Sequence, residues 1–430
     1  MTAAPLLPPV ATRAHPVWLR VGTLLDGSAG RPQPEANVVY DCDEILFVGI
    51  EGRTPPPEIL RVGQTSPDFA APDATLLPGL TDAHAHLFLK GSEIDPARRA
   101  GELRQTPDEL LAHARERLAS LVRLGLAAVR DAGDRHGVGL ALQKLCVQSD
   151  RPTMPFVESP GAAIFHRGRY GAFMAGAIEE YPTPRACVEA RVAAGAGRIK
   201  LIPTGIINFK AGAVTAEPQM TTEELAQLVA AAKSLGRQTF AHASGDTGIA
   251  RALESGVDSV EHGYFLRNDQ LTLMRDRQTA WVPTFAPVQA QLDHAAMLGW
   301  DVATKDNLQR ILAAHAASLR LAHMLGVIIV AGSDAGSCGV PHGFGLLREL
   351  ELMERAGLPP LTVIHAATGA GAVRFGYREK FGRIAPGWRS RFMLTRHSPL
   401  ATVANLRQSR TIVFDGMVFS AGQNEDSTGL

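Results

Sequence analysis

The chain has 430 residues, which is too long for one small domain and fits a large α/β domain with a smaller second one. Basic and acidic residues number 43 each, so the chain lacks the excess of basic residues that would indicate nucleic acid as a partner. No apolar run has the length of a membrane span, and the four cysteines, widely spaced and without a CxxC pair, are typical of reduced thiols in a cytoplasmic protein.

Both ends of the chain carry the pattern of short β-strands. In residues 17–52 apolar and polar residues alternate, with glycine closing each unit, and the same pattern resumes from about residue 382. Residues 54–75, rich in proline and aspartate, predict a loop or linker. We therefore expect one small β-sandwich domain formed by residues 1–75 and 377–430. The first 16 residues indicate a frayed terminus, with a removed export signal as the alternative.

The middle of the chain, residues 76–376, alternates strand-like and helix-like segments. Thr106 with Glu109 and Thr221 with Glu224 form capping boxes at two helix starts. Eight such units predict an α/β fold of the (β/α)₈ TIM-barrel type, and an open doubly wound sheet is the alternative. The eight expected strands span residues 76–87, 127–131, 155–158, 199–203, 238–243, 259–263, 280–284 and 327–334.

Potential metal ligands stand at or near the ends of these strands. In a barrel, the carboxyl ends of all strands face one mouth, so residues far apart in sequence can meet there. Imidazole nitrogen and carboxylate oxygen are ligands that suit zinc or a similar divalent ion. A structural reading of each residue alone stays open, such as a turn residue or a strand-end ion pair. The six candidates are His84, His86, Lys200, His242, His262 and Asp334.

Two of these positions carry specific information. His84 and His86 are two residues apart on a strand, so both side chains point to the same face and can reach one metal. Lys200 is unexpected, because an ammonium would be repelled by a cation. The site is consistent if Lys200 is deprotonated, or carbamylated by CO₂ so that a carboxylate bridges two metals.

These residues lie in motifs that resemble the amidohydrolase superfamily of metal-dependent hydrolases. The strand with Lys200, followed by AHA and VEHG, is similar to the branch of Xaa-Pro and Xaa-Arg dipeptidases and ochratoxin-cleaving amidohydrolases. The C-terminal strand departs from the usual G-x-x-A-D-L and has GWRSRF at 387–392. The matching motifs are PGLTDAHAHL at 78–87, DAGD at 131–134, GRIKLIPTG at 197–205, TFAHASG at 239–245, SVEHGYF at 259–265 and AGSDAG at 331–336.

The resemblance implies two divalent metal ions, with zinc expected. His84, His86 and Asp334 would hold the more buried ion, and His242 and His262 the second. Lys200, as N6-carboxylysine, would bridge the two ions together with a hydroxide that attacks an amide carbonyl. Asp334 would be the catalytic residue that accepts a proton and passes it to the leaving nitrogen.

A basic cluster after the third strand is the candidate for substrate binding. His166, Arg167, Arg169 and Tyr170 follow one another closely in AIFHRGRYG, and arginine binds carboxylates through paired hydrogen bonds. The alternative for this cluster is a solvated loop.

We therefore predict a hydrolase that cleaves an amide bond of a small molecule with a free carboxylate. An N-acyl amino acid, a dipeptide or an ochratoxin-type amide fits. One alternative is a mononuclear cyclic-amide hydrolase or aminohydrolase of the same fold, and another is a non-catalytic descendant of the barrel. The expected partner is the small-molecule amide alone, without nucleic acid or membrane, and the resemblance implies a homo-oligomer.

Overall fold

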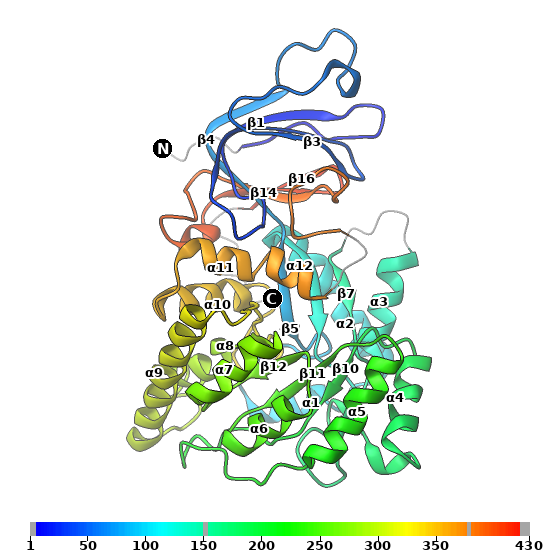
Figure 1. The fold of residues 1–430 in the computed structure, drawn as a ribbon, viewed down its shortest axis with the longest axis vertical. Helices are drawn as coiled ribbons and strands as arrows, with labels where there is room; N and C mark the ends of the chain where they lie inside the picture. The colour runs from blue at the N-terminus through cyan, green and yellow to red at the C-terminus, as the bar shows by residue number, and fades with distance from the viewer. Residues whose placement is uncertain (1–5, 149–153, 376–379, 422–430) are drawn as a thin grey trace.

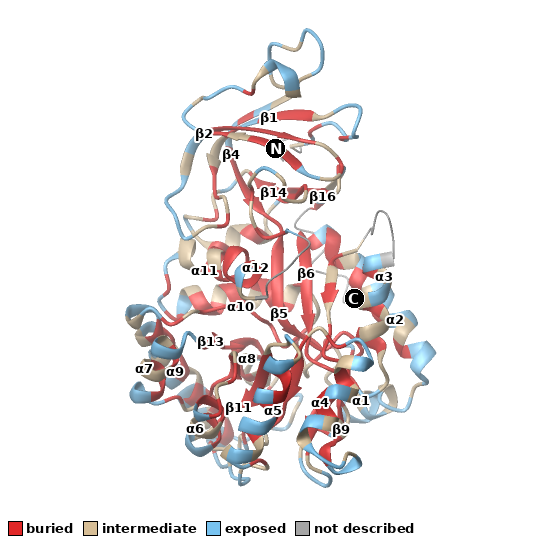
Figure 2. Ribbon diagram, turned by 45° about the vertical axis from the view of Figure 1, so that its right-hand side comes forward, coloured by how far each residue is buried: buried red, intermediate tan, exposed pale blue. Residues whose placement is uncertain are grey.

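The computed structural model describes residues 6–148, 154–375 and 380–421. A β-rich region contains strands from both ends of the chain, and an α/β region contains the middle (Figure 1). In Figure 1 the β-rich region lies at the top, and helices surround the strands of the α/β region below it. Figure 2 shows that the strands are mostly buried, whereas the outer helices expose part of their surface.

One seven-stranded sheet forms the β-rich region. Its order is β16-β15-β14-β4-β1-β2-β3, so strands from the two ends of the chain pair through β4 and β14. The strands are β1 (Val17–Leu24), β2 (Gln33–Tyr40), β3 (Ile45–Gly49), β4 (Phe69–Pro78), β14 (Arg391–Thr395), β15 (Arg410–Phe414) and β16 (Met417–Ala421).

This sheet differs in detail from the expected sandwich, because a continuous hydrogen-bonded ladder joins all its strands. The long strand β4 pairs with β1 and, over its last residues, also with β14. Tyr40 of β2 nevertheless contacts Phe392 of β14, with ring centroids 4.9 Å apart, although two strands separate them in the sheet. The sheet therefore bends over so that its two ends pack against each other around one apolar core.

Parallel strands make up the centre of the α/β region. A three-stranded sheet has the order β5-β6-β7, and a six-stranded sheet has the order β13-β12-β11-β10-β8-β9. The strands are β5 (Leu80–Ala85), β6 (Leu126–Asp131), β7 (Phe156–Glu158), β8 (Ala163–Phe165), β9 (Ala175–Ala177), β10 (Ile199–Leu201), β11 (Thr239–Ala243), β12 (Ser259–His262) and β13 (Ala280–Val282).

Helices follow most of these strands, which gives the expected alternation. Thr106 and Glu109 form the reciprocal capping box at the start of α2, and Thr221 accepts a hydrogen bond from the backbone N–H of Glu224 at the start of α5. Among the described helices, none combines the length and apolar character of a membrane span. The helices are α1 (Pro96–Glu102), α2 (Pro107–Ser120), α3 (Val138–Gln148), α4 (Pro184–Ala193), α5 (Thr222–Ser234), α6 (Asp246–Glu254), α7 (Asn268–Arg277), α8 (Phe285–Asp293), α9 (Val302–Leu325), α10 (Phe344–Arg355), α11 (Pro360–Ala366) and α12 (Gly369–Phe375).

Two expected strands take a less regular form. The third, expected over residues 155–158, is found as β7, and a second short strand, β8, follows after residues 159–162. The break lies at Pro160, which offers no N–H, and Gly161, which has a positive φ of 63°. The eighth, expected over residues 327–334, makes isolated parallel bridges instead of a continuous strand. Ile329 bridges to Trp281, and Ala335, directly after the expected strand, bridges to Ala85. This segment divides its backbone hydrogen bonds between β13 and β5, so neither ladder becomes regular.

Candidate active site

The structure places all six predicted ligands at one end of the parallel strands. His84, Lys200 and His242 lie within β5, β10 and β11, and His262 is the last residue of β12. His86 follows β5 directly, and Asp334 lies in the irregular segment beside it. Each of the six is less than a tenth exposed. Parallel strands bring their carboxyl ends to a common edge, where ligands bind in α/β folds.

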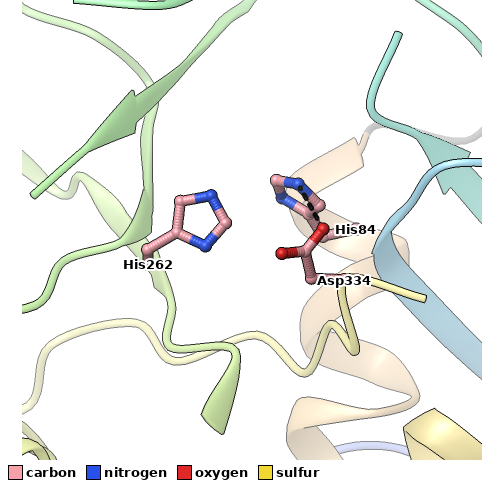
Figure 3. Close-up of side chains that lie close together, drawn as sticks. All are labelled: His84, His262 and Asp334. Carbon is pink, nitrogen blue, oxygen red and sulfur yellow. Dashed lines mark ion pairs between the residues drawn. The ribbon is translucent and has the colours of Figure 1, made fainter. Parts of the chain in front are cut away.

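The side chains converge at short distances. Asp334 Oδ1 lies 3.7 Å from His84 Nε2 and 3.5 Å from His86 Nε2. One ligand atom each from His84, His262 and Asp334 lies within 4.8 Å of the others, and Figure 3 shows His262 facing the other two. The ring centroids of His242 and His262 are 4.5 Å apart. Four imidazoles and one carboxylate therefore share one small volume.

A buried carboxylate determines the tautomer of His84. Its Nδ1 lies 2.6 Å from Glu261 Oε2, and a carboxylate can only accept there, so Nδ1 carries the proton. Its Nε2 is buried and has no hydrogen-bond partner in the described structure. Arg130 and Ser259 also donate to Glu261, at 2.7 Å each, which holds this carboxylate in place. The lone pair of His84 Nε2 is thus left without a proton, as a metal ligand requires.

Backbone carbonyls determine the tautomers of two further histidines. His86 donates from Nδ1 to the carbonyl of Gly133 at 3.2 Å, which leaves Nε2 as the basic nitrogen. His242 donates from Nε2 to the carbonyl of Gly205 at 3.3 Å, which leaves Nδ1. Sequence patterns say nothing about these choices, because the acceptors come from separate loops.

The electrostatic environment keeps the imidazoles neutral. Burial, followed by the charge of Lys200, lowers the pKa of His86 and of His242 to about 3. Burial also holds the pKa of His84 and His262 well below 6.5. Neutral imidazoles with fixed lone pairs and a carboxylate fit a zinc-like divalent ion. The residues of this site are therefore compatible with the metal that the sequence predicts.

Strained backbone marks the same place. His262 and Asp334 both have positive φ values, 66° and 54°, in the left-handed region that non-glycine residues rarely occupy. Such conformations persist where the surrounding structure enforces them, and they cluster at functional sites.

Lys200 has the character of a reactive amine. It is buried, and its Nζ lies 4.7 Å from the ring centroid of Phe240. Burial lowers its pKa to about 8, because the charged form loses its hydration there. Burial acts in the opposite sense on Asp334 and raises its pKa to about 7, with Lys200 opposing the shift. Both groups can therefore change protonation state near neutral pH.

A cavity of about 300 Å³ lies beside the predicted metal ligands. His86, Lys200, His242, His262 and Asp334 all contribute to its lining. Apart from them the wall is largely apolar, with residues from several loops that include Phe173, Met174, Ile207, Phe209, Tyr264 and Val288. The site can therefore hold a small molecule with a bulky apolar group beside the metal ligands.

Only Tyr170 of the four predicted substrate residues lines this cavity, where its ring lies 5.3 Å from that of His242. Acidic side chains contact two of the others, His166 and Arg167, and a backbone carbonyl holds Arg169. His166 contacts Glu179 at 2.7 Å and Glu224 at 2.8 Å. Arg167 pairs with Glu180, and Arg169 donates to the carbonyl of Glu217. The structure thus places His166, Arg167 and Arg169 outside the described cavity. Acidic side chains balance the charge of His166 and Arg167, whereas the contact of Arg169 is with a neutral carbonyl.

The His166 network predicts a pH-dependent contribution to stability. Burial alone lowers the His166 pKa, but the hydrogen bonds and charges of Glu224 and Glu179 outweigh it and raise the pKa above 6.5. A raised folded-state pKa stabilises the fold below the unfolded value of about 6.5 and loses this effect as pH rises. We expect His166→Gln to lower the free energy of unfolding more at about pH 5.5 than at about pH 8.5. Urea unfolding measures this difference, and exposed His323→Gln is the control. A larger loss at high pH would contradict it.

Glu261 is a site residue that the sequence motifs did not identify. A carboxylate directly before His262 in a buried strand could have revealed it, because a buried charge needs a partner. We expect Glu261→Gln to weaken zinc affinity by about 10–100-fold, as loss of a hydrogen-bond partner of a ligand typically does. Titration calorimetry of zinc into metal-free protein measures the change, with exposed Glu189→Gln as the matched control. An unchanged affinity would show that Glu261 does not orient His84.

Comparison with known proteins identifies a hydrolase family and relatives that cleave amide bonds. The sequence model of the Amidohydrolase family matches residues 75–422. Ochratoxinase from Aspergillus niger is 24% identical over 437 aligned positions, covering 95% of this chain and 87% of the relative. The crystal structure of a Xaa-Pro dipeptidase with bound methionine matches with a TM-score of 0.78 and 25% identity, covering 94% of this chain and 100% of the other. The structure of the A. niger ochratoxinase matches with a TM-score of 0.74 and 22% identity, covering 95% and 96%.

Proposed function

This chain belongs to the amidohydrolase family and is a hydrolytic enzyme acting on amide bonds, and we propose that its substrate is a small amide with a free carboxylate. The observation that carries the metal-dependent part of the proposal is the buried Nε2 of His84, which has no hydrogen-bond partner among the described residues. Glu261 holds the proton on the opposite nitrogen, so this nitrogen, 3.7 Å from Asp334 Oδ1, is left with a lone pair for a divalent ion.

Two divalent ions fit the donor set. We propose that His84, His86 and Asp334 hold one ion and that His242 and His262 hold the other. Lys200, as a carbamate, would supply oxygen ligands to both. Zinc is the expected metal, because imidazole and carboxylate ligands predominate. When bound, such ions polarise a carbonyl oxygen and lower the pKa of water, which makes water a nucleophile at neutral pH.

The chain's own residues supply the proton transfer. Asp334 Oδ1 lies beside His84 and His86, and burial raises the Asp334 pKa to about 7, close to the working pH of a general base. Asp334 takes a proton from water as the new C–O bond forms at the amide carbon. It returns the proton to the nitrogen as the C–N bond breaks, so the products are a carboxylic acid and an amine.

The lining of the cavity supports a proposal about the kind of amide. Its apolar wall suits an aromatic or large aliphatic group. The relatives include an ochratoxinase and a Xaa-Pro dipeptidase. We therefore propose N-acyl amino acids, dipeptides and ochratoxin-type amides as the substrate class.

A closed (β/α)₈ barrel, comprising residues 76–376, is the architecture that we propose for the site. The irregular segment supports closure by its backbone hydrogen bonds to both neighbouring strands. On one side Trp281 donates to the carbonyl of Ile328 and accepts from the N–H of Val330, and on the other side Ala83 donates to the carbonyl of Ala331. The chain connection from β7 to β8 links the two sheets on the opposite side. Residues 1–75 and 377–430 would then form the β domain.

The test is a hydrolysis assay with zinc-loaded protein. We expect turnover of at least one N-acyl amino acid, dipeptide or ochratoxin, and none of a neutral cyclic amide. Metal analysis on the same preparation distinguishes the two-metal enzyme from the mononuclear alternative. One ion per chain and an unmodified Lys200 would favour a mononuclear cyclic-amide hydrolase or aminohydrolase. Turnover of the cyclic amide alone would overturn the proposal.

A further inference from the structure

Arg99, in α1, is a cation in the cavity wall that the site described so far does not use. Its side chain is partly buried. Among the described residues that line the cavity, Arg99 and Lys200 are the two with a basic lysine or arginine side chain. In the part of the chain that the structure describes, no carboxylate forms an ion pair with it. The neighbouring carboxylates are engaged elsewhere, since Glu93 pairs with Arg98 and Glu102 with Arg117.

Three backbone carbonyls hold the guanidinium in position. Nη1 donates to the carbonyls of Lys90 at 3.4 Å and Glu93 at 3.2 Å, and Nη2 donates to that of Gly336 at 2.9 Å. These acceptors are neutral, so they fix the group without balancing its charge. A guanidinium has five N–H donors, which leaves the Nε–H and one Nη2–H for another acceptor. Neighbouring donors of this kind match the two oxygens of a carboxylate.

The position of Arg99 relates it to the reacting centre. Gly336, which it contacts, lies two residues after Asp334 and also lines the cavity. His86 and Cys338 line the same cavity as Arg99. Arg99 is therefore close to the metal ligands without being one of them.

We propose that Arg99 binds the carboxylate of the substrate through its Nε–H and Nη2–H and so selects amides of amino acids with a free acid group. This inference rests on the proposed function and names the residue that recognises its substrate. The apolar wall around Phe173, Phe209 and Val288 would receive the large side chain or acyl group. The basic cluster at His166 cannot serve this purpose in the same way, because Glu179 and Glu224 already balance it.

Binding of two matched ligands tests the assignment. N-acetyl-L-phenylalanine and N-acetyl-L-phenylalaninamide differ only in the acid group, and titration calorimetry measures their affinities for the zinc-loaded and the metal-free protein. The variants are Arg99→Gln, Arg99→Lys and, as matched control, Arg98→Gln, whose side chain is exposed on the same helix. Thermal unfolding checks that each variant is folded.

We expect Arg99→Gln to weaken binding of the acid at least about tenfold, as loss of a hydrogen-bonded charge pair typically does, and to change binding of the amide less than about threefold. Arg99→Lys should lie between Gln and wild type, and Arg98→Gln should match wild type. Equal losses for both ligands would show that Arg99 only holds the loops together, and no loss would exclude contact; either overturns the proposal. Because the metal-free protein binds these ligands without turnover, an inactive protein that still prefers the acid through Arg99 would refute the hydrolase proposal and not this one.

Discussion

Replacing Asp334 with asparagine is expected to reduce kcat for amide hydrolysis by a factor on the order of 10³, with KM changed little. Asparagine keeps the size of the side chain and an oxygen near His84 and His86, but its amide cannot accept and return a proton. Burial raises the pKa of Asp334 above its ordinary value, which favours a carboxylate that can hold a proton between the two steps.

Steady-state kinetics on the best substrate of the assay measures this effect, with metal content determined in parallel. Asp293→Asn, at an exposed position at the end of α8, is the matched control and should keep wild-type kinetics. If Asp334→Asn retained its metal and its kcat within about fivefold, proton transfer would have to be assigned to another group.

Replacing Lys200 with alanine is expected to lower activity by more than about 100-fold, beyond the loss typical of residues that only orient a ligand. The buried amine has a pKa of about 8, so part of it is neutral at physiological pH, and the neutral amine can react with CO₂. The reaction forms an N–C bond and releases one proton, so the ammonium is replaced by an anionic carbamate. That change of sign removes the repulsion between Lys200 and a cation.

Isotopically labelled bicarbonate with NMR detection should give a carbamate signal in the wild type that Lys200→Ala lacks. Metal analysis should show fewer ions per chain in the variant. Lys233→Ala, at an exposed position in α5, is the control and should change neither measurement. An active Lys200→Ala protein with its full metal content would contradict a bridging role.

Much of the site follows from local sequence patterns. His84 and His86 share a strand face because side chains alternate along a strand, and the other four candidates stand where apolar runs end. The cap at Thr106 follows equally from its neighbours. These features need only a few consecutive residues, so a single sequence contains the information.

The assignment of substrate contacts shows the limit of such patterns. His166, Arg167 and Arg169 form a basic cluster in the sequence, but Glu179, Glu180 and Glu224 arrive from other segments and neutralise most of it. Arg99 attracts no notice in the sequence, yet it lines the cavity and forms no ion pair with a carboxylate in the described ranges 6–148, 154–375 and 380–421. Net charge at a point depends on everything within a few ångströms, and the sequence does not list those neighbours.

The sequence by itself determined the alternating strands and helices, the β-strands at both ends, and the six residue types of the centre, because each rests on periodicity or on position within one segment. Tertiary structure decided which nitrogen of His84 and His86 is free, how the β sheet bends, and which arginine lines the cavity. These properties arise from contacts between segments that are distant in the chain, such as Glu261 with His84 or Tyr40 with Phe392. Only the folded backbone sets those distances.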